Sequence, residues 1–314
     1  MNSTRRRHLA TLAAAAGSLQ AADANPQSKM TLCAFSKHFQ WTDIKETAEL
    51  CASFGYEGID ITLRPGGHVL PERVEDDLPK AVDLIRKAGL KVPMVTSHIV
   101  DAKTPHAERV VKALAGLGIR NYRWGGFRYN DRAPIPAQVE EFRARTKDLA
   151  ALNRQYGVCA MYHTHSGVTQ VGASFWDLYL ILKDQNPAEV SVNYDIGHAT
   201  VEGGLGGWQH SSRLLMPYVR GVALKDFAWK QNDKKGWSAA WCALGQGMVN
   251  FKLFLPMLKA ANFQGPLQLH MEYPELGGAD SGKSTYSIPK AQLLEIFRRD
   301  VVLCKKMLRE AGLA

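Results

Sequence analysis

Residues 191–198, S-V-N-Y-D-I-G-H, indicate most directly how this chain folds. An apolar, β-branched run ends at Asp195, and His198 follows three residues later, where a strand should pass into a loop. In parallel α/β folds, the side chains at the carboxyl ends of strands form catalytic and metal sites. Alone, the D-x-x-H spacing is a weak signal, because many Asp and His residues at strand ends only cap loops. Its weight depends on the residues that end the other strands.

The same pattern, a short β-branched run followed by an amphipathic helical segment, repeats about eight times along the chain. The predicted strands are 31–36, 57–62, 91–97, 121–126, 158–165, 190–195, 220–227 and 266–273. The predicted helices are 43–54, 77–88, 106–117, 137–156, 174–183, 211–219, 250–261 and 289–311, and a long polar, Trp-rich loop follows the seventh strand. Gly55, Gly89, Gly118 and Gly157 stand just past helix ends, as C-cap residues do. Eight units in this length predict an α/β protein with one closed (β/α)8 TIM barrel.

The first 24 residues differ from the rest of the chain. Arg5, Arg6 and Arg7 precede a short Ala-rich run, and Ala22-Asp23-Ala24 fits a signal-peptidase site. The pattern predicts a signal peptide over 1–24, of the twin-arginine type, although His8 stands where that signal usually has a large apolar residue. The barrel would then occupy 25–314 and the protein would be periplasmic or secreted. The apolar run is too short for stable membrane insertion.

Composition narrows the class of partner. Without residues 1–24 the chain keeps a net charge of +7, and this charge is spread along the sequence. A nucleic-acid-binding protein more often has a basic stripe with interleaved aromatic residues, so we expect no nucleic-acid partner. The five cysteines are scattered, odd in number and free of C-x-x-C spacing, which is typical of core or surface residues. Homo-oligomer formation stays open.

Ligand-type residues follow most of the predicted strands. In a barrel the carboxyl ends of all strands meet at one mouth. The residues at or just after these strand ends are His68, His98, Trp124, His163, His165, Asp195, His198, Lys225, Asp226, His270 and Glu272. We predict that His163, Asp195 and Glu272, from three different strands, hold a divalent metal. His98 and His270, taken singly, are more typical of ordinary loop histidines. Lys225 sits in an apolar strand, so its charge requires an acidic neighbour or an anionic substrate.

Five motifs give the chain a family resemblance: Y-H-T-H-S-G (162–167), D-I-G-H (195–198), A-L-K-D-F (223–227), G-Q-G (245–247) and M-E-Y (271–273). With them the chain resembles the xylose isomerase-like TIM-barrel superfamily of sugar isomerases and epimerases, which includes inosose dehydratases and ketose 3-epimerases. The resemblance implies one divalent cation (Mn, Co, Zn or Mg) held by Glu, Asp, His and Glu on strands five to eight. Asp195 and Glu272 match two of these positions, whereas His163 replaces the first Glu and Ala223 replaces the His. His165 or His198 supplies the missing donor, or the metal keeps an extra water, or the site has lost its metal.

The resemblance also implies a reaction, proton transfer next to the carbonyl of a sugar through an enediolate. Glu272 and Asp195 would move the proton, with His198 or Lys225 as partners, and His198 would complete the ligands. His68, His98, Trp124 and His165 would contact the substrate, together with Trp229 of the Trp-rich loop. The same site could instead act as a dehydratase or lyase of 3-keto sugars or inososes, and Ala223 argues for a non-catalytic carbohydrate-binding barrel. An exported protein would meet a free or oxidised sugar, such as a keto-glycoside, more often than a sugar phosphate.

Overall fold

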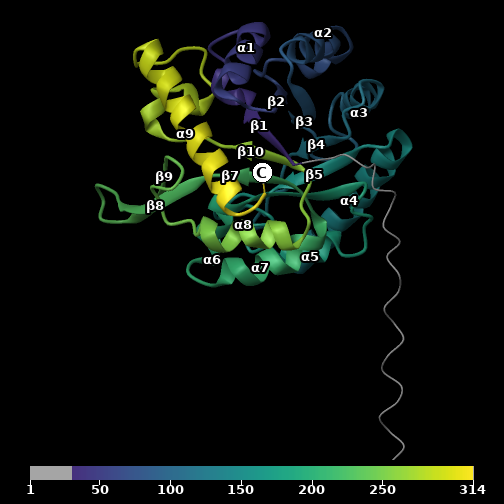
Figure 1. The fold of residues 1–314 in the computed structure, drawn as a ribbon. Helices are drawn as coiled ribbons and strands as arrows, with labels where there is room; N and C mark the ends of the chain where they lie inside the picture. The colour runs from purple at the N-terminus through teal and green to yellow at the C-terminus, as the bar shows by residue number, and fades with distance from the viewer. Residues whose placement is uncertain (1–29, 314) are drawn as a thin grey trace, which may run out of the picture.

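Eight parallel strands close into a barrel in the computed structural model, which describes residues 30–313 (Figure 1). The predicted TIM barrel is therefore confirmed. In order around the barrel the strands are β1 (Thr31–Phe35), β2 (Gly58–Leu63), β3 (Lys91–Ser97), β4 (Asn121–Trp124), β5 (Cys159–His163), β6 (Val190–Asp195), β7 (Val219–Leu224) and β10 (Pro266–Leu269), which pairs back to β1. The signal peptide predicted over 1–24 lies outside the described residues.

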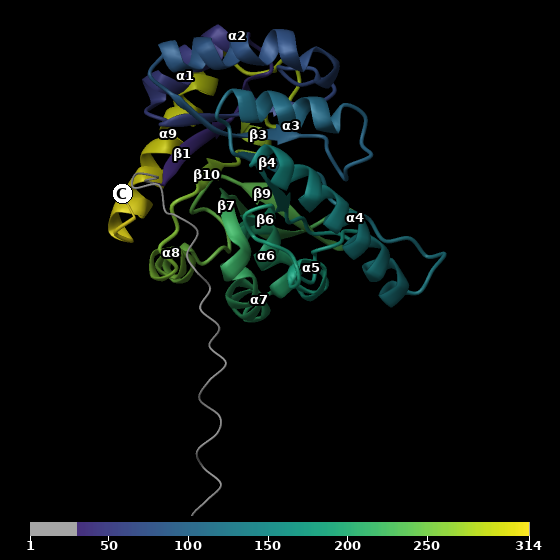
Figure 2. The same cartoon turned by 90° about the vertical axis from the view of Figure 1, so that its right-hand side faces the viewer.

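Helices surround the barrel, as the two views at right angles show (Figure 1, Figure 2). They are α1 (Ile44–Phe54), α2 (Val74–Lys87), α3 (Ala107–Gly116), α4 (Ile135–Tyr156), α5 (Trp176–Leu182), α6 (Ile196–Gly203), α7 (Gly207–Leu215), α8 (Phe251–Ala260) and α9 (Lys290–Glu310). The carboxylate of Asp43 accepts the Glu46 N–H and starts α1, and Gly55 ends it with a φ of 87°, a left-handed conformation that glycine adopts without strain. Between residues 30 and 313, each helix is too short or too polar to cross a membrane.

Two segments differ from the prediction. The Trp-rich segment after the seventh strand is an antiparallel hairpin of β8 (Asp226–Gln231) and β9 (Trp237–Cys242), not a loop. Its five-residue connection lacks the two-residue turn that identifies a hairpin in a sequence. Helix α6 was also missed: it begins directly after β6, because Asp195 ends the strand and accepts the His198 N–H as the helix cap.

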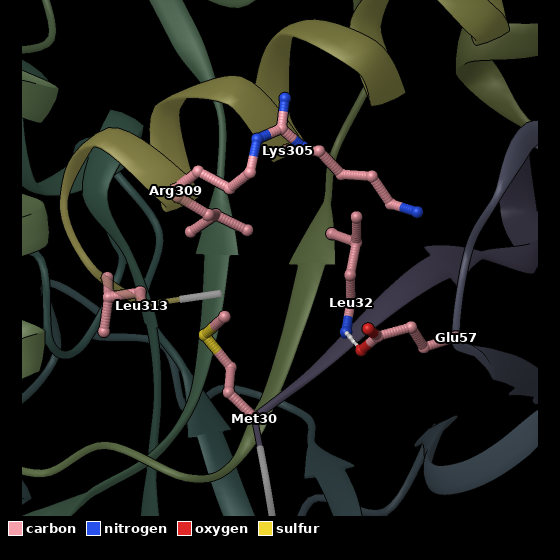
Figure 3. Close-up of a pocket in the computed structure, with 7 residues that line it drawn as sticks. Met30, Leu32, Glu57, Lys305, Arg309 and Leu313 are labelled. Atoms are coloured by element: carbon pink, nitrogen blue, oxygen red, sulfur yellow. Dashed lines mark hydrogen bonds between the residues drawn. The ribbon is translucent and has the colours of Figure 1, made fainter.

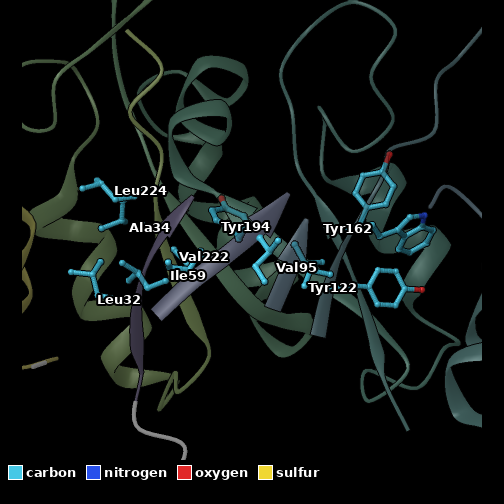
Figure 4. Close-up of a cluster of buried hydrophobic side chains, with 14 of the residues drawn as sticks. Leu32, Ala34, Ile59, Val95, Tyr122, Tyr162, Tyr194, Val222 and Leu224 are labelled. Carbon is cyan, nitrogen blue, oxygen red and sulfur yellow. The ribbon is translucent and has the colours of Figure 1, made fainter. Parts of the chain in front are cut away.

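Alternation along the strands sorts their side chains into two layers. Residues such as Leu32, Ile59, Val95 and Val222 join the large apolar core between the barrel and its helices (Figure 4). Inside the barrel, Met94, Cys159 and Met161 form a small separate apolar cluster. Gln268 contacts the Met94 sulfur and accepts a hydrogen bond from the Asn193 amide, 2.9 Å away. The barrel interior therefore changes from apolar to polar toward the ends of β5, β6 and β10.

Candidate active site

Three buried residues meet at the mouth of the barrel: His163 at the end of β5, Asp195 at the end of β6 and His270 just after β10. Asp195 Oδ2 lies 3.7 Å from His163 Nε2 and 3.8 Å from His270 Nδ1. One donor atom from each residue lies within 4.8 Å of the other two. We call these three residues the His-Asp-His group. Two imidazoles and a carboxylate are ligands that zinc and other divalent transition metals bind.

Neighbouring residues orient each member of the group. The Asn193 amide lies 3.0 Å from His163 Nδ1, and the other ring nitrogen, Nε2, is turned toward Asp195. With the Asn193 amide oxygen turned to accept the Nδ1 proton, the Nε2 lone pair would be free for a metal. Because Asp195 Oδ1 caps helix α6, its Oδ2 is directed at the two histidines. His270 stacks on the Phe35 ring, with 4.7 Å between the ring centroids. Such supporting contacts fix the orientation of metal ligands in proteins.

The electrostatics of the His-Asp-His group suit a cation. Burial raises the pKa of Asp195 to about 6, and burial, with the charge of Arg123, holds the pKa of His163 and of His270 well below the usual range. Both imidazoles are therefore neutral near pH 7 and keep a lone pair for a ligand. Asp195 Oδ2 is buried and has no hydrogen-bond partner within residues 30–313. A buried carboxylate oxygen beside neutral imidazoles is costly unless a cation neutralises it, so these residues fit a divalent metal.

Glu272 lies beside this group but is engaged elsewhere. Its two carboxylate oxygens pair with Lys37, from the short 3-10 helix after β1, and with Lys225, after β7. Burial alone would raise the pKa of Glu272, but the charges of Lys225 and Lys37 hold it well below its usual range. The sequence assigned the strand-eight ligand to Glu272 and little weight to His270. In the structure, His270 is the residue from this strand that joins Asp195 and His163.

His198 occupies the space between Asp195 and Lys225. Its Nδ1 accepts the Ser166 N–H at 3.1 Å, so the proton of the neutral ring is on Nε2. Nε2 lies 4.0 Å from Asp195 Oδ2 and 3.4 Å from Lys225 Nζ. A protonated nitrogen does not bind a metal, so this geometry suits a hydrogen-bond donor better than a ligand.

Ala223, which stands at the position of the family's histidine, is fully buried in β7 and pairs with Asp195 in register. Its methyl group offers no ligand. His165 does not replace it, because both of its ring nitrogens are in use: Nδ1 contacts the His163 carbonyl at 3.2 Å, and Nε2 accepts from Arg123 at 3.1 Å. The described residues therefore offer three good ligands, and water would complete the coordination of a bound ion.

Three residues that the sequence placed at strand ends make their contacts away from the His-Asp-His group. Trp124 is a correction: it is fully buried, its indole N–H donates to Val100 O at 2.7 Å, and its ring packs against Tyr162, so it belongs to the core. His98 is held within its own loop, with Nε2 3.0 Å from Pro105 O. Asp226 accepts backbone N–H groups from 245, 247 and 249 and anchors the G-Q-G segment.

The indole that contacts the site is Trp241 rather than Trp229. Lys225 Nζ lies 3.7 Å from the centre of the Trp241 ring, and the His198 ring lies 4.6 Å from it. Trp229, two residues along β8 from Phe227, is 40% exposed and packs edge-on against that ring. The hairpin therefore contributes an aromatic wall to the site through β9.

Sequence reasoning missed charged and polar residues that β1, β2 and β4 bring to the barrel interior and mouth. Lys37 and His38 follow β1, and F-S-K-H at residues 35–38 carries the same signal of ligand-type residues after a strand. Arg123, one residue before Trp124, carries its charge into the barrel mouth and bonds to His165. Asp60, inside β2, accepts a hydrogen bond from Thr96 at 2.7 Å. The signal in the sequence was that Asp60 is a charged residue within an apolar strand, two positions before Thr62 and so on the same face.

The cavities lie at two ends of the barrel. One of about 310 Å³ opens at the mouth and is lined by His68, Gln40 and Ser284, with glycines 66, 67 and 282. His68 is fixed there by contacts to Thr62 and Thr42. A second cavity of about 210 Å³ lies beside the start of β1, where Lys305 and Arg309 of α9 stand above Met30 and Leu32 (Figure 3). The mouth cavity is the one on the side of the His-Asp-His group.

Comparison with known proteins agrees with this architecture. The sequence profile of the xylose isomerase-like TIM barrel family matches residues 48–291. No curated protein sequence matches the chain. Its fold is similar to that of 3-keto-D-glucoside 4-epimerase from E. coli, at 14% identity and a TM-score of 0.63, covering 88% of this chain and 100% of that one.

Two further solved structures share the fold. The IolI protein with a bound zinc atom has 15% identity and a TM-score of 0.65, covering 90% of this chain and 98% of that one. The "probable 3-DHS dehydratase AsbF" from Bacillus anthracis has 12% identity and a TM-score of 0.63, covering 88% and 99%. At these identities the likeness concerns the fold. Together with the profile match, which spans most of the chain, the closed barrel establishes that this protein belongs to the xylose isomerase-like TIM barrel family.

Proposed function

We propose that this protein is a metal-dependent sugar isomerase or epimerase, which moves a proton on the carbon next to a carbonyl through an enediolate. The observation that carries the proposal is the buried Asp195 Oδ2, which faces His163 and His270 and has no hydrogen-bond partner within residues 30–313. The similar folds include a sugar epimerase and a protein with bound zinc, which supports this class of reaction.

His163, Asp195 and His270 would hold the divalent metal, which is Mn, Co, Zn or Mg. Bound there, such an ion supplies a Lewis acid that polarises the substrate carbonyl. Asp195 would then act as a ligand and not as the base, because its side chain is fully buried. A small keto sugar would bind at the same mouth of the barrel, where the cavity lined by Gln40, His68 and Ser284 opens.

Glu272 is our candidate for the base. Its side chain is 23% exposed, so a substrate can reach it, and its lysine neighbours keep it ionised. Lys225 would stabilise negative charge as it develops on a substrate oxygen, since its ammonium group is buried beside Glu272 and Trp241. The His198 Nε2–H, 3.4 Å from Lys225 Nζ, offers a second donor to the same region.

The second candidate function is that of a dehydratase or lyase of 3-keto sugars or inososes. Lys225 favours it, because its ammonium group could protonate a leaving oxygen after the same proton abstraction, with the adjacent His198 N–H as a hydrogen-bond donor. The resemblance in fold to the protein named as a 3-DHS dehydratase is consistent with this alternative. The substrate class would be unchanged, and the two reactions would differ only in whether water or an aglycone is lost.

One experiment separates these alternatives from a non-catalytic carbohydrate-binding barrel. The purified protein is analysed for bound metal and then incubated with keto sugars in D2O, and the products are followed by NMR. We expect deuterium next to the carbonyl without loss of water or aglycone; loss of either would instead favour the lyase. If no metal is retained or required, and Asp195→Ala leaves folding and sugar binding intact, the enzyme proposal is wrong.

We also propose that the protein acts outside the cytoplasm, as the sequence of residues 1–24 predicts. Protein recovered from the periplasm or medium should begin near Asn25. Recovery of the full-length chain from the cytoplasm alone would contradict this location.

A further inference from the structure

Two arginines flank the candidate active site without taking part in the proposed proton transfer. Arg123 reaches the mouth from β4, and Arg64 follows the last residue of β2. The guanidinium carbon of each lies 5.9 Å from the centre of the Phe35 ring. His270 stacks on the same ring at 4.7 Å. Phe35 therefore connects both arginines to the His-Asp-His group.

Most hydrogen-bond donors of these arginines are unused. A guanidinium group carries five N–H donors in a planar fork. Within residues 30–313, the Arg123 side chain makes one hydrogen bond, to the neutral His165 ring, and the Arg64 side chain makes none. Neither forms a salt bridge in the described part of the chain, where Asp60, inside β2, bonds instead to Thr96. Both arginines are half-buried, and burial lowers the pKa of Arg123 to about 10.

The charges at the mouth do not balance. Lys37, Lys225, Arg64 and Arg123 are cationic, and Glu272 pairs with only the two lysines. The buried Asp60 and Asp195 act electrostatically on the arginines but form no ion pair with them in the described part of the chain. A metal in the His-Asp-His group would add further positive charge. A neutral sugar would leave most donors of two half-buried guanidinium groups without a charged acceptor, whereas a carboxylate would accept from their forks in the geometry that arginine favours.

We propose that Arg64 and Arg123 bind a carboxylate of the substrate, so that the substrate is a keto sugar acid rather than a neutral keto sugar. This inference rests on the proposed function, because it places the carboxylate beside the same reacting carbonyl. The Phe35 ring, which both arginines and His270 contact, would set the spacing between the carboxylate and the metal group.

Binding of three unreactive, matched polyols tests the proposal. D-Gluconate carries a carboxylate, D-glucitol is its neutral counterpart and D-glucitol 6-phosphate carries a phosphate. Calorimetric titration of the full-length protein should give an affinity for gluconate about tenfold or more above that for glucitol. Arg64→Met and Arg123→Met should each remove most of this preference and leave glucitol binding unchanged.

Arg298→Met is the matched control, because Arg298 also stands over a phenylalanine ring, that of Phe54 at 5.4 Å, but on helix α9. It should bind gluconate as the native protein does. If a Met variant does not fold, as judged by near-ultraviolet circular dichroism, Arg64→Lys and Arg123→Lys replace it. Lysine keeps the charge and loses the fork, so gluconate affinity should fall several-fold.

Equal affinity of the native protein for gluconate and glucitol would overturn the proposal. Tighter binding of the phosphate than of gluconate would overturn the assignment to a carboxylate. If Arg298→Met lowered gluconate affinity as much as the Arg64 and Arg123 variants do, gluconate binding would depend only on the overall charge of the protein. That result would also overturn the proposal. None of these polyols has a ketone or aldehyde carbonyl, so none can undergo the proposed reaction, and the comparison of native protein with the arginine variants isolates the contribution of Arg64 and Arg123. Deuterium uptake into neutral keto sugars without gluconate binding would leave the proposed function standing.

Discussion

Asp195 Oδ2 lies 3.7 Å from His163 Nε2, although the two residues end different strands and both are buried. Within residues 30–313 this oxygen has no hydrogen-bond partner, and both ring nitrogens of His163 lie near polar groups. An unpaired buried carboxylate costs stability, so the arrangement is understandable if a cation occupies the space. The same carboxylate also caps helix α6 through its other oxygen.

Asp195→Asn should abolish stoichiometric metal binding and lower deuterium exchange by about 100-fold or more, because the amide is a poor ligand. Folding should survive, since the amide oxygen can still accept the His198 N–H that starts α6. Metal content and NMR exchange rates check this prediction. Asp184→Asn, on the surface beside Arg143, is the control and should behave as the native protein does. A full complement of metal in the Asp195 variant would contradict the ligand assignment.

Lys225→Met should separate chemistry from metal binding. Lys225 lies outside the His-Asp-His group, so the variant should keep its metal. It should lose about 100-fold or more in exchange rate, because the ammonium group beside Glu272 would no longer stabilise developing charge. The exposed Lys230 of β8 provides the control substitution to Met. Unchanged exchange in Lys225→Met would remove this residue from the mechanism.

The sequence predicted the barrel well because its signals are local. Alternating strands and helices, caps such as Asp43 and C-terminal glycines such as Gly55 depend on neighbours in the chain. It also offered two interpretations of Asp195, a loop cap or a ligand, and the structure shows that one oxygen serves as the cap while the other faces the histidines.

The site was harder to predict because it depends on contacts between strands. His270 and Glu272 stand two residues apart, and spacing does not reveal that two lysines engage Glu272 while His270 turns to Asp195. Lys37 lies 235 residues from its partner Glu272. Residue type does not distinguish Trp124 from Trp241, yet Trp124 is buried in the core and Trp241 contacts the site.

Trp241→Ala and Trp229→Ala form a matched pair of substitutions on the hairpin. Trp241 covers Lys225 and His198, so its loss should raise KM for the substrate by about tenfold, with a smaller effect on kcat. Trp229 is 40% exposed and should matter little. Steady-state kinetics of both variants test the assignment. Equal effects, or a larger effect at Trp229, would mean that the substrate contacts β8 instead.

Asp60 gives a pH-dependent prediction that does not involve the metal. Burial raises its pKa to about 7, although Thr96 and Arg123 act in the opposite direction. In the unfolded chain its pKa is close to 4. Between these values the folded protein holds a proton that the unfolded chain has released, so stability falls as pH rises from 4 to 7. At about 1.4 kcal/mol per pH unit, the loss is roughly 4 kcal/mol.

Asp60→Asn should remove this loss, because an amide is not ionised and its oxygen can still accept from Thr96. The difference in free energy of unfolding between variant and native protein should be small near pH 4 and should grow to a few kcal/mol in favour of the variant near pH 8. Urea unfolding at both pH values measures it. Buried histidines such as His38, whose pKa burial lowers to about 3, make the protein less stable in acid, but they do so in both proteins and cancel in the difference. A difference that does not change with pH would show that Asp60 is ionised throughout, held by Arg64 and Arg123, and would leave those arginines less free to bind an anion.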